Sequence, residues 1–522
     1  MADQFPEKSV SKSQIENGEA RKVLSAHEAR IMDQEGYIVD TEGGISSQGL
    51  KLAKDGHTVL IPQPSDDPED PLNWSSAKKT IVLLVVSWAS LLPDYGSATG
   101  AVTLIPQAKI WHMTSDNVNH SQAGNVFMLG PGGIAAVALS AYFGRLPVLF
   151  WFLVVAFATA AWCAGAKTFD SFMAARILNG FFSTVAQGGG LYFVNDMYFF
   201  NQRARKINIW AGFIILSPYF GPLFAAFITS TQHWSVAFWV YTAMTGLALI
   251  LTILFVPETY YNRHAHLESR PANGSRIATL IGFHQRRVNL LEPNTFVDAM
   301  LRPIKVIMKP TAFLSVAYYC LTFAWVVGIN TTLSIFLEPL YGFGALQIGY
   351  FYFTPIVAVA LGEITGHWLH DAIARQYIHK HHGHFEPEVR LRAIFVSIPC
   401  MISGLVGLGF CLDRGWHYMT TSVCWGLYVF GVMIATVALN AYNLDSYPEG
   451  SGEVAAWLNQ ARVLGGFIIS YFQVKWADSM GADKSFSVQG AIVAAAFFIV
   501  LILIKWGKSM REWSGPLQFK TI

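Results

Sequence analysis

Residues 81–105 read IVLLVVSWASLLPDYGSATGAVTLI, an apolar stretch with one carboxylate, Asp94, directly after Pro93. The stretch is long enough to cross a lipid bilayer as a helix. A carboxylate near the middle of a membrane helix costs at least about 3 kcal/mol on insertion scales, so it persists where it faces water or a partner. Asp94 therefore indicates a polar route through the membrane. A packing bond to a neighbouring helix is the alternative.

The composition indicates a membrane protein. Of 522 residues, 53% are hydrophobic and 13% charged, and the mean hydropathy is +0.37, well outside ordinary soluble usage. The net charge of +2 gives no strong surplus that would indicate nucleic-acid binding. The five cysteines lack the paired spacing of a disulfide framework or a zinc site. No phosphate-binding G-x-x-x-x-G-K-[ST] loop occurs, so ATP is not expected to be the direct energy source.

Apolar runs near the spanning length of about 20 residues predict an all-α membrane protein with twelve transmembrane helices. The predicted spans are 80–104, 122–143, 147–167, 171–195, 207–229, 235–256, 311–338, 345–368, 393–412, 417–440, 454–475 and 487–505. The N-terminus has no short apolar segment typical of a signal peptide. The first span is therefore expected to direct insertion.

Polar segments divide the chain into five parts. We expect a flexible cytosolic segment over 1–78, a six-helix bundle over 79–256, a cytosolic loop over 257–310, a second bundle over 311–505 and a cytosolic tail over 506–522. Lys and Arg gather in the central loop and in the short loops on the same side. Because basic loops stay in the cytosol, both termini are predicted to be cytosolic.

The two halves resemble each other, as repeats in transporters do. The fourth span ends in YFVNDMYF, which places Asp196 at its inner end, and the tenth ends in AYNLDSYP, which places Asp445 at the matching point. A six-plus-six duplication predicts two pseudo-symmetric bundles that rock about a central site.

These features resemble the major facilitator superfamily, from about Asp67 to Trp506. Within it the chain is similar to the fungal twelve-span drug:proton antiporters, and to the group that contains the yeast histidinol and polyamine cation transporter. The segments that carry the resemblance are DPEDPLNWS, LPDYGS, FGRLPVLFW, FLEPLYGFG and NLDSYPEGSGEVAAWLNQARVLGGF.

The superfamily's inner-loop motif, G-x-L-a-D-r-x-G-r-r, is only partly present. Gly144 and Arg145 match it, but Ala141 stands where the family has Asp. The resemblance implies a weak first-half gate, with more of the closure carried by the second half. A simple turn and topology signal is the alternative interpretation of Gly144 and Arg145. The residues expected to act in gating are Gly144, Arg145, Asp196, Arg203, Glu363, Asp371 and Asp445.

Two further elements match the family. RILNGFFSTVAQ resembles its R-x-x-x-G element, and the resemblance implies that Arg176 takes part in proton coupling; a structural Arg bonded to helix carbonyls is the alternative. AGFIILSPYFGPLFAAF resembles the antiporter element through Gly221 and Pro222. Together with Pro93, these two residues are expected to bend helices and allow close packing.

Polar and aromatic residues interrupt the seventh span, and the eighth starts with the aromatic-rich sequence YFYFTPIVA. Aromatic rings around a carboxylate suit a cationic ligand, since cation–π attraction is worth roughly 1–2 kcal/mol when desolvated. The predicted substrate and proton site comprises Asp94, Tyr319, Trp325, Asn330, Tyr352 and Asn440. Each of these aromatic residues has packing as its alternative role.

The sequence thus predicts a proton-coupled secondary transporter of small organic cations such as polyamines or basic drug-like amines, acting by alternating access. The alternatives are an exporter of a neutral or anionic fungal metabolite, a transporter-fold nutrient sensor, and a membrane enzyme with the histidine cluster HKHHGH. We expect a non-enzymatic monomer in the plasma membrane, with the vacuolar membrane as the alternative. No cofactor, metal or nucleic acid is expected. Asn119-His120-Ser121 forms a glycosylation sequon.

Overall fold

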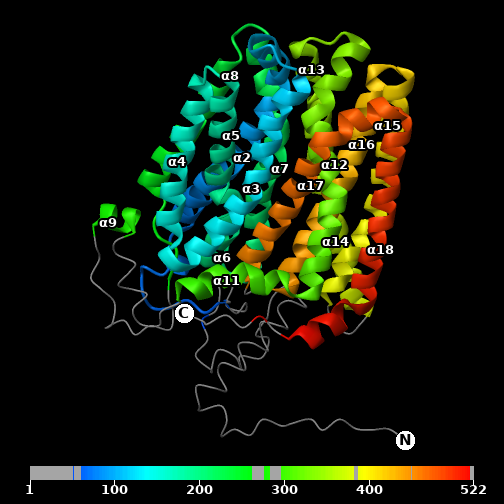
Figure 1. Ribbon diagram of the computed structural model, residues 1–522. Helices are drawn as coiled ribbons and strands as arrows, with labels where there is room; N and C mark the ends of the chain where they lie inside the picture. Colours follow the sequence, from blue (N-terminus) through cyan, green and yellow to red (C-terminus); the bar gives the residue numbers. More distant parts are fainter. Residues whose placement is uncertain are drawn as a thin grey trace, which may run out of the picture.

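The computed structural model describes residue 51, residue 60 and residues 62–261, 275–282, 295–380, 386–447, 450–515 and 517. Over these ranges the chain is helical and contains no strand. Long helices lie side by side in one bundle (Figure 1). We call the end of the bundle at which the short helix α11 lies the α11 end, and the opposite end the far end.

The N-terminal half begins after a short 3-10 helix, η3 (Pro71–Asn73). Its helices are α2 (Ser76–Trp111), α3 (Ser115–Phe143), α4 (Arg145–Gly165), α5 (Phe169–Ser183), α6 (Val185–Met197), α7 (Phe200–Thr229) and α8 (Ser235–Phe255). Two short helices follow in the central segment, α9 (Arg276–Ile281) and α11 (Phe296–Ile307).

The C-terminal half contains the helices α12 (Pro310–Tyr341), α13 (Ala345–Phe351), α14 (Phe353–Lys380), η5 (Pro387–Ala393), α15 (Ile394–Arg414), α16 (Tyr418–Ser446), α17 (Ser451–Met480) and α18 (Ala482–Ser514). Each half therefore supplies six spans, because α5 continues into α6 and α13 into α14.

The predicted apolar runs lie in helices apart from a few end residues and the breaks at Thr184 and Tyr352, and the predicted fold class is confirmed. Ten helical segments of the described chain are long and apolar enough to cross a membrane. The two remaining spans are the fourth, which is interrupted at Thr184 between α5 and α6, and α17, which carries Glu453 and Arg462. The helices extend beyond the apolar runs because helical hydrogen bonding continues past the hydrocarbon layer.

The sequence specifies several helix ends through local hydrogen bonds. The hydroxyls of Ser75, Thr114 and Thr168 accept backbone N–H groups at the starts of α2, α3 and α5, which satisfies donors that have no partner within the helix. Gly144 joins α3 to α4 with a φ of 94°. Glycine takes this conformation without steric cost, so a sharp turn can form here.

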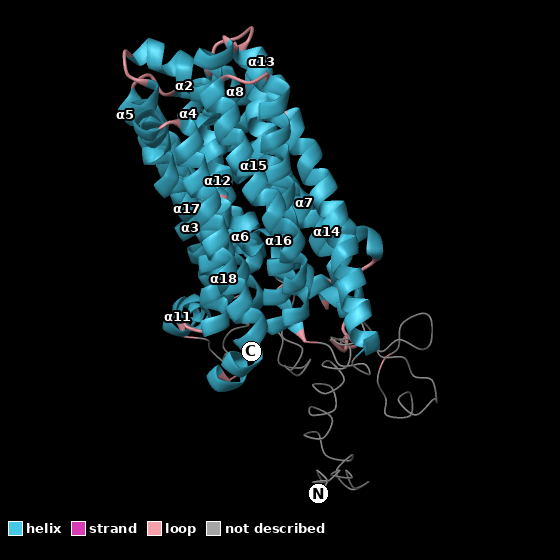
Figure 2. Ribbon diagram, turned by 90° about the vertical axis from the view of Figure 1, so that its right-hand side faces the viewer, coloured by secondary structure: helices cyan, strands magenta, loops and turns pink. Residues whose placement is uncertain are grey.

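One hydrophobic cluster consists mainly of the C-terminal half and extends to residues of α7, and a second consists mainly of the N-terminal half. The halves meet mainly where α3 lies against α17 and where α7 lies against α13 and α14. The approach of α3 to α17 is close, since a Cβ added at Gly130 would lie 2.1 Å from the side-chain oxygen of Gln460. Figure 2 shows the helices as one elongated bundle with α11 at its lower edge.

The segment directly before α2 is packed against the bundle. The Tyr261 hydroxyl donates to the Asp67 carboxylate at 2.9 Å, and Asp70 caps η3 by accepting the Leu72 N–H at 3.0 Å. The buried Lys79 ammonium donates to the Leu72 carbonyl at 2.9 Å. Polar side chains thus connect residues 67–79, part of the segment expected to be flexible, to one another and to the stretch that follows α8.

Candidate functional site

A buried ion pair joins the two halves at the middle of the bundle. Arg462 of α17 donates to the Asp94 carboxylate of α2 at 2.6 Å. The same carboxylate oxygen accepts the side-chain N–H of Gln187, on α6, at 2.5 Å. Asp94 is 7% exposed and Arg462 5% exposed. The carboxylate predicted to mark a polar route thus has a cation from the opposite half as its partner.

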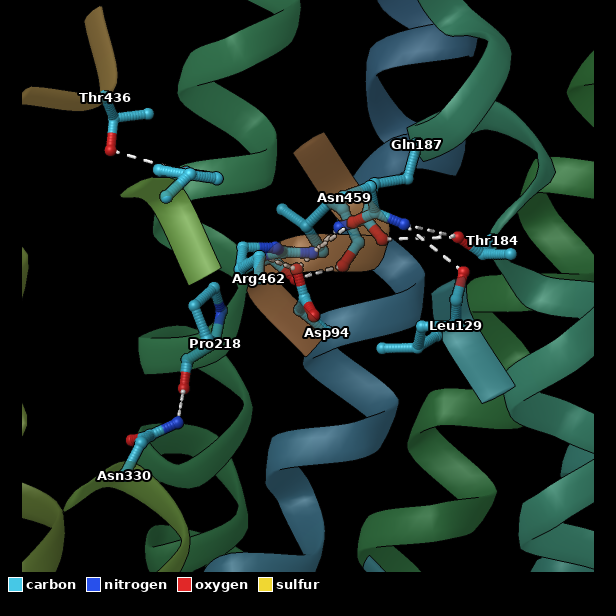
Figure 3. Close-up of polar contacts among 12 residues, drawn as sticks. Asp94, Leu129, Thr184, Gln187, Pro218, Asn330, Thr436, Asn459 and Arg462 are labelled. Carbon is cyan, nitrogen blue, oxygen red and sulfur yellow. Dashed lines mark hydrogen bonds and ion pairs between the residues drawn. The ribbon is translucent and has the colours of Figure 1, made fainter. Parts of the chain in front are cut away.

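Asn459 extends this network towards the N-terminal half. Its side-chain oxygen accepts the second Arg462 nitrogen at 2.8 Å, and its N–H group reaches the carbonyl of Leu129 on α3 at 3.2 Å and the hydroxyl of Thr184 at 3.5 Å. Figure 3 shows these side chains converging from several helices. We call Asp94, Thr184, Gln187, Asn459 and Arg462 the midplane network.

Because this ion pair is buried, loss of either of its charges is expected to lower the stability of the protein strongly. A lone charge at this depth is costly, and removing one member of a buried pair typically destabilises a protein by about 3–5 kcal/mol because the other charge is left uncompensated. Arg462 was not among the predicted site residues. The signal that could have revealed it is its position in the eleventh apolar run, which makes it a second intramembrane charge opposite in sign to Asp94.

Aromatic side chains line the network on the C-terminal half. The Arg462 guanidinium lies 5.7 Å from the Phe323 ring centre, and the Tyr319 ring lies 5.1 Å from Phe323. The Tyr319 hydroxyl accepts a hydrogen bond from Thr436 at 3.3 Å. Tyr319 therefore adjoins the network through Phe323, whose ring faces Arg462.

The other predicted substrate residues lie apart from Asp94 or in the core. The Asn330 side chain donates to the Pro218 carbonyl at 3.0 Å, away from the midplane network in Figure 3. The Tyr352 hydroxyl donates to the Asn330 carbonyl at 3.1 Å. Trp325 is buried in the core of the C-terminal half, and Asn440 is half-buried on α16.

Arg176 binds backbone rather than a carboxylate. Its guanidinium donates to the carbonyls of Gly96 at 2.6 Å and Ser97 at 2.8 Å, and its side chain is 1% exposed. These bonds fix α5 to the turn of α2 that follows Asp94. The contacts match the alternative interpretation of a structural Arg, through which the position of Asp94 is held.

The predicted helix-bending residues lie beside the same stretch of α2. Pro93 and Pro222 are inside α2 and α7, where they remove backbone donors. A Cβ added at Gly221 would lie 2.4 Å from the Tyr95 carbonyl oxygen. Glycine at 221 therefore permits α7 to approach the backbone of α2 next to Asp94.

The halves are also joined at the far end. Ser334 of α12 donates to the Ala101 carbonyl at 2.7 Å, and Lys475 of α17 pairs with Asp116 of α3 at 3.1 Å. Asn119 donates to the Ser470 carbonyl at 3.4 Å and is fully buried. Its sequon is therefore inaccessible to a glycan in this state, and the residue contributes to closure instead.

A second set of bonds joins the halves at the α11 end. The Asn195 side chain donates to the Ser451 hydroxyl at 2.5 Å, which joins α6 to α17. Arg302 of α11 pairs with Glu453 of α17 at 2.8 Å. Because bonds cross between the halves at both ends, the midplane network is enclosed in this conformation.

The predicted gating residues form bonds inside each half. Arg145 pairs with Asp196 at 2.8 Å, and Arg390 pairs with Asp445. Both partners of each pair belong to one half, so neither pair crosses the interface between the halves. Gly144 provides the turn that places Arg145.

The remaining gating predictions have other environments. Arg203 donates to the carbonyls of Asn195 at 3.0 Å and Tyr198 at 2.9 Å. Glu363 is half-buried on α14, and Asp371 lies on the same helix with its side chain outside the described residues. Over the described part of the chain, no group of three or more His, Cys, Asp or Glu residues could hold a metal ion.

Relatives of the chain are transporters. It is 23% identical to an uncharacterised MFS-type transporter of Schizosaccharomyces pombe, over 94% of this chain and 95% of that protein. It is 25% identical to the MFS-type transporter hepF of Aspergillus oryzae, over 87% and 94%. It is also 23% identical to the efflux pump FUB11 of Gibberella fujikuroi, over 74% and 67%.

Solved structures share the fold. The xylose transporter XylE of E. coli, in a partially occluded inward-open conformation, matches with a TM-score of 0.58 and 16% identity, over 82% of this chain and 99% of that one. The human organic anion transporter MFSD10 matches with a TM-score of 0.53 and 16% identity, over 81% and 99%. The family model of the Major Facilitator Superfamily matches residues 87–470. The chain therefore belongs to the Major Facilitator Superfamily of membrane transporters.

Proposed function

We propose that this protein is a proton-coupled secondary transporter that exports a small organic metabolite by alternating access. The observation that supports this most directly is the buried Asp94–Arg462 pair, which links the two halves at the middle of the bundle. A bond that exists only when the halves are in one arrangement stabilises that arrangement alone. The pair is therefore suited to couple a binding event to the movement of the halves.

Proton binding to Asp94 provides the coupling step. An ionised carboxylate attracts the Arg462 guanidinium, whereas a protonated one keeps only neutral hydrogen bonds to Arg462 and Gln187. Protonation from one side of the membrane weakens the link between the halves and frees Arg462. Release of the proton to the other side restores the link.

The substrate that fits this chemistry is neutral or anionic, with a hydrogen-bond acceptor. Arg462 offers only donors, and it becomes available when Asp94 is protonated. An organic cation would instead have to displace the guanidinium from Asp94 in a buried site. Amines and polyamines are the second candidate class, supported by the aromatic rings of Tyr319 and Phe323 beside the pair. The relatives described as efflux pumps support export as the direction.

Transport assays with a panel of labelled carboxylic acids, neutral metabolites and amines test the proposal. Expressing cells should export at least one acceptor-bearing compound, and a protonophore should abolish this export. Asp94→Asn should also abolish it, whereas the matched variant Asp196→Asn, a carboxylate paired within one half, should retain much of the transport at equal surface level. Export that survives both the protonophore and Asp94→Asn would contradict the proposal, and export of amines alone would select the cation class.

The orientation and location are part of the proposal. We place both termini and the α11 end in the cytosol and the protein in the plasma membrane as a monomer, on the basis of the basic loops at that end. Epitope tags at the two termini should bind antibody only after the cells are permeabilised. Binding of either tag on intact cells would contradict this orientation.

A further inference from the structure

Helix α11 lies across the end of the bundle (Figure 1). Its twelve residues pack against α3 and α17, which belong to different halves. Ala299, Pro303 and Val306 form its buried face. The carbonyl of Pro303 accepts the indole N–H of Trp457 at 2.8 Å, and Arg302 pairs with Glu453. One side of α11 is therefore fixed to the first turns of α17.

The opposite side of α11 is apolar and exposed. Val297, Leu301, Ile304 and Met308 are 58%, 39%, 48% and 76% exposed, respectively. At 3.6 residues per turn, positions 297, 301, 304 and 308 share one narrow face. We call these four residues the α11 stripe. Contact of such a stripe with water is unfavourable by about 25 cal/mol for each Å² of apolar surface.

The position of the stripe indicates what covers it. Figure 2 shows α11 at the edge of the molecule, below α3 and α17, rather than beneath the centre of the bundle. The Phe296 ring lies 5.4 Å from Tyr142, and Phe143 next to it ends α3 and is 36% exposed. The stripe therefore adjoins the apolar flank of the spanning helices, which contacts lipid in any membrane-embedded state.

Charge at the border of the stripe points to the headgroup region. Lys305 is exposed and follows Ile304 in the chain. A helix with an exposed apolar stripe can lie in the interface plane of a bilayer, with its apolar side chains among the upper acyl chains and a cation such as Lys305 near anionic headgroups. A long Lys side chain can reach the headgroups while its stem contacts apolar surface.

We propose that α11 docks on the phospholipid surface through the α11 stripe and thereby holds the first turn of α17 in the closed position. The docking does not depend on the proposed transport function, because it concerns a lipid contact of the folded chain. Its effect on the closed state does rest on that function, since it uses the movement of the halves.

Collisional quenching tests the docking. Full-length protein with Ile304→Cys is labelled with a small fluorophore and reconstituted in vesicles of phosphatidylcholine and phosphatidylglycerol. Lipid carrying a nitroxide near its headgroup should quench this label several-fold more than a label at Glu69→Cys, an exposed position before α2. Iodide in the buffer should instead quench the Glu69→Cys label more strongly than the Ile304→Cys label. The unsubstituted protein, treated in the same way, corrects for labelling of the five native cysteines.

Two results would overturn the docking. Quenching of the Ile304→Cys label by iodide as strongly as the Glu69→Cys label would mean that water covers the stripe. Protection from both quenchers would mean that another part of this chain covers it.

A second measurement tests the link to α17. With Leu301→Gln and Ile304→Gln combined, Ser451→Cys in the same vesicles should react with a maleimide several-fold faster, because the first turn of α17 is released. Lipid quenching of the Ile304→Cys label together with an unchanged reaction rate at Ser451→Cys would retain the docking and reject its effect on closure. Loss of transport in a separate assay would bear on the proposed function alone.

Discussion

The two halves of the molecule are alike at the α11 end and different at the centre. In the N-terminal half, Arg145 follows the second span and pairs with Asp196 at the end of the fourth. In the C-terminal half, Arg390 lies between the eighth and ninth spans and pairs with Asp445 at the end of the tenth. The repeat therefore preserves a bond that holds the helices of each half together.

The centre shows no such repetition. The N-terminal half contributes the anion Asp94 and the C-terminal half the cation Arg462, so the pair forms only when the halves meet. This difference indicates a division of roles. Repeated ion pairs keep each half rigid, and complementary charges between the halves define the state in which they are joined.

The largest effect is expected from separating the central pair. Asp94→Asn or Arg462→Gln leaves one buried charge without a partner, so each should destabilise the protein by about 3–5 kcal/mol. The double variant removes both charges and should recover most of this loss while remaining unable to couple transport to protons. The unfolding temperature of each detergent-solubilised variant measures the three effects. It is obtained from the folded fraction that size-exclusion chromatography detects after heating.

The stability losses of the two single variants and the double variant together show whether Asp94 and Arg462 interact. If the double variant loses as much stability as the sum of the two single variants, Asp94 and Arg462 do not interact and the link between the halves lies elsewhere. The conservative variant Arg462→Lys keeps the charge and should fall between the parent and Arg462→Gln, because Lys lacks the two-pronged geometry that reaches both Asp94 and Asn459.

Next in size are the repeated pairs. Asp196→Asn and Asp445→Asn each remove a partly buried ion pair, so each should lower stability by about 1–2 kcal/mol. Neither should change the balance between conformations, since both partners move with one half. Unfolding temperatures and the reactivity of Ser451→Cys towards a maleimide report the two properties. A several-fold change in reactivity for Asp445→Asn alone would support the prediction that Asp445 acts as a gate.

Much of the fold follows from local sequence. The twelve helices come from apolar length, their ends from capping hydroxyls such as Ser75 and from Gly144, and the repeat from the positions of Asp196 and Asp445. These features depend on neighbours in the chain.

The centre of the site depends on packing between distant segments instead. Asp94 was predicted because a charge in an apolar run is visible in the sequence, but its partner Arg462 is 368 positions away. No periodicity specifies which face of α17 meets α2, or that Asn459 reaches the Leu129 carbonyl. Trp325 and Tyr352 were predicted from their aromatic character, and the structure buries both in a hydrophobic cluster that residue type alone does not specify.

A smaller effect is expected across the α11 end. Arg302→Gln removes the partner of the buried Glu453, and an ion pair of this kind contributes on the order of 1 kcal/mol, which corresponds to about a fivefold shift in population. Ser451→Cys should therefore react with a maleimide about fivefold faster in the Arg302→Gln background. Arg276→Gln, which removes bonds to the Ile253 carbonyl within the N-terminal half, serves as the control and should leave the rate unchanged.

The smallest effects on stability are expected at two glutamates, Glu258 in the N-terminal half and Glu386 in the C-terminal half. Glu258 accepts the backbone N–H groups of Arg145 and Leu146 at 3.1 and 3.0 Å, so Glu258→Gln should cost about 1 kcal/mol through a weakened start of α4. Glu386 pairs with Lys508 at 3.0 Å, but these side chains are 39% and 60% exposed. Water and salt screen the second pair, so Glu386→Gln should cost only a few tenths of a kcal/mol.

The pH dependence of Glu386 sharpens this last comparison. The hydrogen bond from Lys508 lowers the pKa of Glu386 below its ordinary value. A carboxylate whose pKa is lowered by folding stabilises the folded protein at pH values above its unfolded pKa of about 4.3. This contribution is lost as the pH falls through the pKa of the carboxylate in the folded protein. The difference between parent and Glu386→Gln should therefore be constant from about pH 6 to 8 and should disappear as the pH falls through the lowered pKa that Glu386 has in the folded protein. Unfolding temperatures across this range measure it. A difference that grows on acidification would mean that Glu386 is stabilised in its protonated form, which would reverse the role assigned to Lys508.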